Sequence, residues 1–183
     1  MEIRNTNFSG LHIVVSDYKH DDRGSFARLF CDETLSFLLQ KRAIKQINHS
    51  INLKAGLVRG MHYQNPPFSE MKLVRCIKGC VFDVAVDLRK SSDGFLQIHT
   101  EILKAGDGKM MVIPEGFAHG FQALEDESEL LYLHTEAYHP EAEKGLNPED
   151  PMLSIKWPMP VDGLSERDAA HPWLTNNFEG VGL

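Results

Sequence analysis

The sequence reads Gly56-Leu-Val-Arg-Gly-Met-His-Tyr-Gln64 in one stretch and Val112-Ile-Pro-Glu-Gly-Phe-Ala-His-Gly-Phe121 in another. Each stretch carries apolar residues into a bend marked by Pro or Gly and sets one histidine beside other polar groups. This pattern is typical of a strand that ends at a cavity. We therefore expect His62 and His119 to face one pocket from two separate segments.

Short strand-like segments surround these two stretches. Residues 72–78 and 81–89 combine polar–apolar alternation with β-branched runs, so we expect two strands joined through Gly79. In another strand Gln46 and Asn48 alternate with apolar residues, which places both amides on one side, either in the pocket or in solvent. That strand spans residues 45–51, and further strands are expected at residues 11–15, 26–30, 95–103, 109–113 and 130–134.

One helix is expected, from a cap at Asp32 to about Arg42, because leucines at 35, 38 and 39 recur on one helical face. From Tyr138 onward the chain is rich in Pro, Glu and Asp and has few strand runs. Many short strands, regular Gly/Pro turns and one short N-terminal helix predict an all-β barrel or double-sheet roll. We expect one domain over residues 1–183, with an irregular C-terminal cap that can include helix.

Composition narrows the class of protein. Of the 183 residues, 42% are hydrophobic and 25% are charged, which is ordinary for a globular chain. The formal net charge of -7 disfavours nucleic acid as a partner, because phosphate backbones are bound by clustered Lys and Arg. The N-terminus has no charged-then-apolar leader and no apolar run approaches membrane-spanning length. We therefore expect a cytoplasmic protein that binds neither nucleic acid nor membrane.

The chain has 3 cysteines, an odd number with no metal-ligand spacing. Cys76 and Cys80 are close enough in sequence to suggest a redox pair. Buried packing is the simpler interpretation, because free cysteine behaves as a small hydrophobic residue.

Several ordered motifs carry a family resemblance. Gly56, His62, Glu70 and Gly79 resemble the first cupin motif, and Gly108, Pro114, Gly116 and His119 resemble the second. Within the cupins, four strings are similar to the dTDP-4-dehydrorhamnose 3,5-epimerase family: Val-Arg-Gly-Met-His-Tyr-Gln, Val-Phe-Asp-Val-Ala-Val-Asp-Leu-Arg, Pro-Glu-Gly-Phe-Ala-His-Gly-Phe and Leu-Ser-Glu-Arg-Asp. The resemblance runs from about Arg23 to Asp168. It implies a cupin-type jelly-roll barrel and a cofactor-independent epimerase.

Metal binding is an alternative, because catalytic cupins that hold a metal use two closely spaced histidines and a carboxylate. Here Gln64 stands at the second histidine position, which leaves His62, Glu70 and His119. The resembled family is metal-free, so we expect neither metal nor cofactor. A metal-dependent cupin enzyme and a non-catalytic sugar-binding cupin remain alternatives.

The resemblance also implies catalytic roles. A 4-keto sugar has acidic C–H bonds beside its carbonyl, so epimerisation needs a base, an enolate-stabilising group and an acid on the opposite face. By resemblance His62 is the base, Asp168 orients it, Lys72 faces the enolate oxygen and Tyr132 is the acid. Taken singly, each residue also fits an ordinary structural role. The family's reaction inverts C3 and C5, and a single-carbon epimerase remains an alternative.

Ligand-binding roles follow from the same resemblance, which implies a dTDP-linked keto-deoxy sugar as substrate. Tyr138 matches the aromatic residue on which thymine stacks, and His119 pairs with Asp83 in a partly architectural role. The other implied contacts are Arg23, Phe26, Gln46, Asn48, Arg59, Glu143 and Arg167. The family exchanges its N-terminal strand between protomers, so a homodimer is implied.

Arg28 departs from the family pattern, which has a glutamate in the motif that here reads Asp21-Asp-Arg-Gly-Ser-Phe-Ala-Arg28. A ligand-contacting carboxylate is thus replaced by a guanidinium. One interpretation is that the nucleobase, the pyrophosphate contact or the sugar of the ligand differs from the usual one. The other is that Arg28 turns to solvent. The sequence leaves both open.

Overall fold

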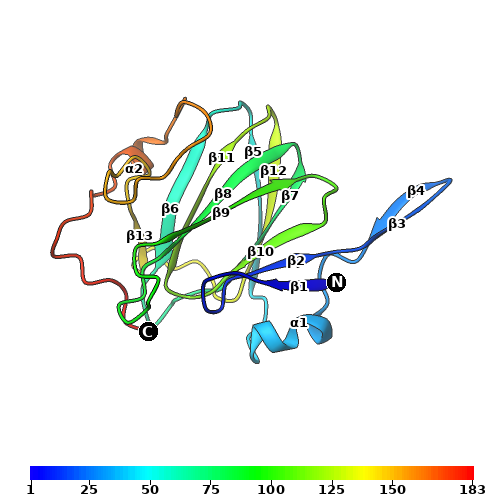
Figure 1. Cartoon of the computed structure of the whole chain (residues 1–183), viewed down its shortest axis with the longest axis horizontal. Helices are drawn as coiled ribbons and strands as arrows, with labels where there is room; N and C mark the ends of the chain where they lie inside the picture. The colour runs from blue at the N-terminus through cyan, green and yellow to red at the C-terminus, as the bar shows by residue number, and fades with distance from the viewer.

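The computed structural model describes residues 1–183 as two antiparallel sheets packed face to face (Figure 1). The first sheet has the order β1 (Glu2–Asn5), β2 (His12–Val15), β10 (Lys109–Ile113), β7 (Lys72–Lys78), β12 (Ser128–His134), β5 (Gln46–Asn52). The second has the order β13 (Glu143–Gly145), β6 (Val58–Gln64), β11 (Phe117–Ala123), β8 (Cys80–Asp87), β9 (Ile98–Lys104). The predicted double-sheet roll is confirmed.

The two sheets are connected at corners, and Gly79 forms one of them. β7 belongs to the first sheet and β8 to the second, so the chain changes sheet at this residue. Gly79 has φ of +72°, and a Cβ atom there would lie 2.5 Å from Oγ of Ser128. Glycine meets both demands, because it has no Cβ and enters the left-handed region freely.

The core between the sheets is apolar at one end. Val74, Met111 and Leu130 from the first sheet meet Val81 and Phe121 from the second, and all five are almost fully buried. Alternation along each strand then sends the next residues to the outer faces. Beyond these apolar residues, the space between the sheets is lined mostly by polar side chains.

Part of each outer face is covered. Helix α1 (Asp32–Leu39) packs Leu35, Leu38 and Leu39 on the first sheet, and each fully buried leucine contributes about 1.5–3 kcal/mol. The C-terminal segment packs leucines, among them Leu146 and Leu153, on the second sheet. This segment holds β13 and the short helix α2 (Glu166–Ala169), so the expected irregular cap with some helix is confirmed.

A separate hairpin, β3 (Tyr18–Asp21) and β4 (Gly24–Ala27), projects away from the two sheets (Figure 1). The sequence predicted a strand at residues 26–30, but the second strand of the hairpin begins at Gly24 and its pairing ends at Ala27. The predicted end of the helix at Arg42 was also too late. Gln40 adopts a left-handed conformation that closes the helix after Leu39.

Cys76 and Cys80 are free thiols, and both are buried. Cys76 belongs to the apolar core, where burial raises the pKa of its thiol to about 12. A thiol that stays protonated is a poor nucleophile, so packing is the better interpretation of this pair. No helix of the structure has the length and apolar character needed to cross a membrane.

Candidate active site

A cavity of about 600 Å³ opens between the sheets, where polar side chains replace the apolar core. His62 on β6 and His119 on β11 both line it, in agreement with the sequence prediction, and they are direct cross-strand partners. Tyr132 and Lys72 line the same cavity from β12 and β7 of the other sheet. The cavity is therefore bounded by polar groups from two facing walls.

His62 is held by a carboxylate from the cap. Its Nε2 lies 2.7 Å from Oδ1 of Asp168, the buried residue of α2, and the Gly60 N–H donates to Oδ2 at 3.2 Å. Burial opposes ionisation of this carboxyl, but the hydrogen bond and charge of His62, with the Gly60 N–H and the charge of Arg167, lower its pKa to about 2. Asp168 is thus a fixed anion that orients the imidazole of His62. It contacts Nε2 and leaves the other ring nitrogen, Nδ1, free of this carboxylate.

The close approach of β6 and β11 depends on Gly60. This residue has φ of +116°, and a Cβ there would lie 2.6 Å from Cα of Gly120. A side chain at position 60 would therefore push the two histidine-bearing strands apart.

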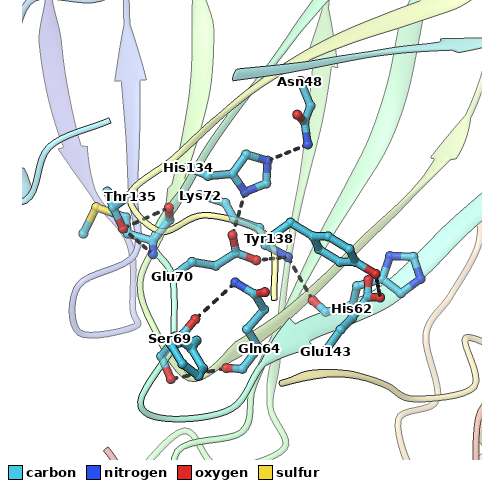
Figure 2. Close-up of polar contacts among 12 residues, drawn as sticks. Asn48, His62, Gln64, Ser69, Glu70, Lys72, His134, Thr135, Tyr138 and Glu143 are labelled. Atoms are coloured by element: carbon cyan, nitrogen blue, oxygen red, sulfur yellow. Dashed lines mark hydrogen bonds and ion pairs between the residues drawn. The ribbon is translucent and has the colours of Figure 1, made fainter. Parts of the chain in front are cut away.

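Lys72 brings a cation to the cavity. Its Nζ donates to the backbone oxygen of His62 at 3.1 Å and lies 3.2 Å from Oε1 of Glu70 (Figure 2). The other oxygen of Glu70 lies 2.7 Å from Nδ1 of His134. All three of these side chains are mostly buried, at 10%, 9% and 11% exposed for Lys72, Glu70 and His134.

Tyr132 lies on the opposite sheet from His62. Its hydroxyl is 3.4 Å from Oγ of Ser50, and its ring meets the edge of His119 at 6.1 Å. Burial raises the pKa of Tyr132, so its phenol keeps its proton at neutral pH. His119 is itself held at 2.7 Å by the fully buried Asp83, which matches the predicted pair.

Another set of side chains lies around the mouth of the cavity. The hydroxyl of Tyr138 donates to Glu143 at 2.7 Å, and Arg167 contacts the same carboxylate oxygen at 2.9 Å. The Tyr138 N–H donates to Gln46 at 3.0 Å, and the tyrosine ring is half exposed. Further predicted contacts that line this cavity are Asn48 and Arg59.

Three predicted ligand contacts lie elsewhere in the chain. Arg23 and Phe26 belong to the projecting hairpin, where Arg23 pairs with Asp21 and Phe26 is 75% exposed. Arg28 follows β4, and its guanidinium lies 3.9 Å from Sγ of Cys31. None of the three lines the cavity of its own chain.

Glu70 and His134 are cavity residues to which sequence reasoning gave no role in catalysis or substrate binding. Glu70 was considered only as a metal ligand, and His134 only as part of a strand. Both line the cavity beside Lys72. A usable signal was present, because His134 follows Tyr132 by two positions and residues at that spacing share one face of a strand.

The three residues weighed as metal ligands do not gather around one point. Glu70 binds Lys72 and His134, while His119 binds Asp83. A different group, His62, Asp168 and His171, has side-chain atoms within 4.8 Å of one another. The guanidinium of Arg167 lies 3.1 Å from His62 Nε2, so its charge disfavours a cation there.

A carboxylate-held imidazole, an ammonium and a protonated phenol thus surround one cavity. An imidazole can remove a proton from carbon, an ammonium can stabilise the resulting oxyanion, and a phenol can return a proton. Fold and site together define the class: an isomerase working by proton transfer on a cupin-type jelly roll. The family model described as dTDP-4-dehydrorhamnose 3,5-epimerase matches residues 5–176, and the chain belongs to this family.

Individual relatives agree with this assignment. The dTDP-4-dehydrorhamnose 3,5-epimerase of Mycobacterium tuberculosis is 36% identical over 186 residues, covering 99% of this chain and 89% of the relative. A crystal structure of the Bacillus anthracis enzyme with TDP and PPi bound superposes with a TM-score of 0.91 at 34% identity, covering 94% of this chain and 99% of that one. The Legionella pneumophila enzyme in complex with dTDP-4-keto-L-rhamnose has a TM-score of 0.88 at 38% identity, covering 94% and 92%.

Proposed function

We propose that this chain converts dTDP-4-dehydro-6-deoxyglucose to dTDP-4-dehydrorhamnose by inverting C3 and C5, using only its own side chains. The observation that carries the proposal is the placement of His62 and Tyr132 on facing sheets of one cavity. A sugar ring between the two walls would present one face to the imidazole and the other to the phenol. This arrangement lets one group remove a proton from one face of the carbon and another group return a proton to the opposite face.

The proton transfers follow from this geometry. His62 removes the proton from the carbon beside the ketone, and the bonding pair moves into the enolate. The ammonium of Lys72 stabilises the charge that develops on the oxygen. Tyr132 then donates its phenolic proton to the opposite face of the carbon, and solvent restores both protonation states. The same cycle at the second flanking carbon completes the double epimerisation.

Binding of the nucleotide is proposed for the mouth of the cavity. Tyr138 offers a half-exposed ring for stacking with thymine, and Arg59 and Arg167 offer guanidinium groups for the pyrophosphate. The relatives from Bacillus anthracis and Legionella pneumophila were crystallised with TDP and with a dTDP-linked sugar, respectively. These ligands support a dTDP-linked keto-deoxy sugar as the substrate here.

We further propose a homodimer in which the β3–β4 hairpin of one copy completes the cavity of its partner. The hairpin projects from the rest of its own chain (Figure 1). It carries Phe26, which is exposed. Ile47 and Ile51 are also exposed on β5, the edge strand of the first sheet. Apolar side chains on an edge strand favour pairing with a second copy. In such a dimer Arg23 and Arg28 would reach a ligand that they cannot reach in one chain.

The proposal is tested by incubating the protein with dTDP-4-dehydro-6-deoxyglucose in heavy water and locating deuterium by NMR. Deuterium at both C3 and C5 is the expected result. Deuterium at one carbon would indicate a single-carbon epimerase. Exchange no faster than in a His62→Ala control, with dTDP still bound, would indicate a non-catalytic sugar-binding protein. Activity that chelator treatment removes and one metal ion restores would indicate a metal-dependent enzyme.

A further inference from the structure

Glu70 is a buried carboxylate inside the cavity for which the family resemblance implied no catalytic role. Its two oxygens have different partners, Lys72 at 3.2 Å and His134 at 2.7 Å (Figure 2). Burial opposes ionisation of Glu70, but the charge of Lys72 and the hydrogen bond from His134 lower its pKa. Glu70 is therefore an anion whose carboxylate plane is fixed from both sides.

Lys72 needs such an anchor to act at a defined position. A lysine ammonium is a point charge on a flexible stem and has three N–H donors. One donor is used by the backbone oxygen of His62 at 3.1 Å and one by Glu70. Because the three donors have tetrahedral directions, these two bonds determine where the third one points. The third donor is left for an oxygen of a ligand in the cavity that Lys72 lines.

His134 is fixed in turn. Asn48 Nδ2 lies 3.4 Å from Nε2 of His134, so this nitrogen is the acceptor and Nδ1 carries the proton that is donated to Glu70. The His134 ring also stacks on the ring of Tyr132, with centroids 6.1 Å apart and an interplanar angle of 20°. One imidazole thus contacts both the anchor of the cation and the proposed acid.

We propose that Glu70, held by His134, is the positioning residue for the Lys72 ammonium, and that the three side chains act as one unit in stabilising the enolate. This inference rests on the proposed function. It assigns Glu70 and His134 to the chemical step, because the nucleotide contacts proposed above lie on other residues at the cavity mouth. Their loss should therefore lower kcat without weakening nucleotide binding.

The test compares a set of variants by kcat, by solvent deuterium exchange and by the Kd for dTDP. Glu70→Ala removes the anchor and should lower kcat about 100-fold, the cost of a misplaced catalytic group. Glu70→Gln keeps an oxygen for Lys72 and should recover part of that loss. His134→Phe keeps a flat ring against Tyr132 but deletes the donor, and should lower kcat about 10-fold. Combining Glu70→Gln with His134→Phe should cost little more than the worse single variant, because residues that act as a unit are not additive.

Glu141→Gln is the matched control, because Glu141 also pairs with a histidine, His139, and both residues lie outside the cavity lining. It should leave kcat and Kd unchanged. The inference is overturned if Glu70→Ala and Glu70→Gln retain kcat within two-fold of the wild type, or if kcat falls only together with dTDP affinity and melting temperature. Absence of exchange in the wild type would instead overturn the proposed function itself, and this inference with it.

Discussion

Asp168 Oδ1 lies 2.7 Å from His62 Nε2, although 106 positions separate the two residues in the chain. The cap segment brings them together by placing α2 against β6 (Figure 1). The carboxylate is almost fully buried, and the imidazole reaches the cavity. This contact links the irregular C-terminal segment directly to the proposed chemistry.

Asp168→Asn tests that link. The substitution keeps the shape of the side chain but removes the charge that orients and stabilises a protonated His62. We expect kcat/KM to fall at least about 100-fold, with the Kd for dTDP little changed. Steady-state kinetics and nucleotide titration measure the two quantities. A kcat/KM within three-fold of the wild type would contradict the role assigned to Asp168.

The same carboxylate predicts a pH dependence of stability. Its pKa is about 2 in the folded protein, below the ordinary value of about 3.9. A lowered pKa contributes stability that is complete above about pH 4 and disappears as pH falls through about 2. The difference in unfolding free energy between wild type and Asp168→Asn should therefore have a pH-dependent part of about 2 kcal/mol. Urea unfolding between pH 6 and pH 2 measures it, and a difference that stays constant with pH would count against the lowered pKa.

Tyr138→Ala tests the proposed nucleotide end of the cavity. Loss of the ring should raise the Kd for dTDP by about ten-fold, because stacking of a base on an aromatic ring is worth roughly 1–3 kcal/mol. Tyr138→Phe is the matched control, since it keeps the ring and loses only the hydrogen bond to Glu143. Calorimetric titration with dTDP measures the Kd of both variants and of the wild type. Equal affinity in both variants and the wild type would place the base elsewhere.

Mixing two impaired variants tests the exchange of the β3–β4 hairpin. Arg23→Ala should weaken activity although Arg23 lies outside the cavity of its own chain. If the hairpin serves the partner's cavity, a heterodimer of Arg23→Ala and His62→Ala chains has one intact site. Unfolding and refolding an equal mixture should then restore roughly a quarter of wild-type activity, because half of the dimers are mixed. No recovery, or a monomer by analytical ultracentrifugation, would oppose this arrangement.

Strand patterns and turn spacing predicted most of the barrel, and the bends after two strands predicted that His62 and His119 share a pocket. Lys72 and Tyr132 were assigned to the site only by family resemblance, because each residue taken singly also fits an ordinary structural role. The contact between Glu70 and His134 was not predictable in this way. It spans 64 positions and depends on the pairing register of β7 and β12, which side-chain periodicity alone does not specify.

The cap was predictable only as an irregular segment. Its path depends on leucines such as Leu146 and Leu153 packing on the second sheet, and such tertiary contacts leave no local period. The partnership of Asp168 with His62 was therefore expected from family resemblance and not from the residues themselves. The helix end was missed for a similar reason, since the left-handed conformation of Gln40 has no strong sequence signal.

The central claim is that His62 and Tyr132 act on opposite faces of the sugar ring. The most direct test follows deuterium exchange and epimer formation separately in His62→Ala and Tyr132→Phe, with dTDP-4-dehydro-6-deoxyglucose in heavy water. We predict that His62→Ala loses both by about 100-fold or more, while Tyr132→Phe keeps exchange with retained configuration and loses epimer formation. A Tyr132→Phe variant that forms the epimer at the wild-type rate would contradict the claim.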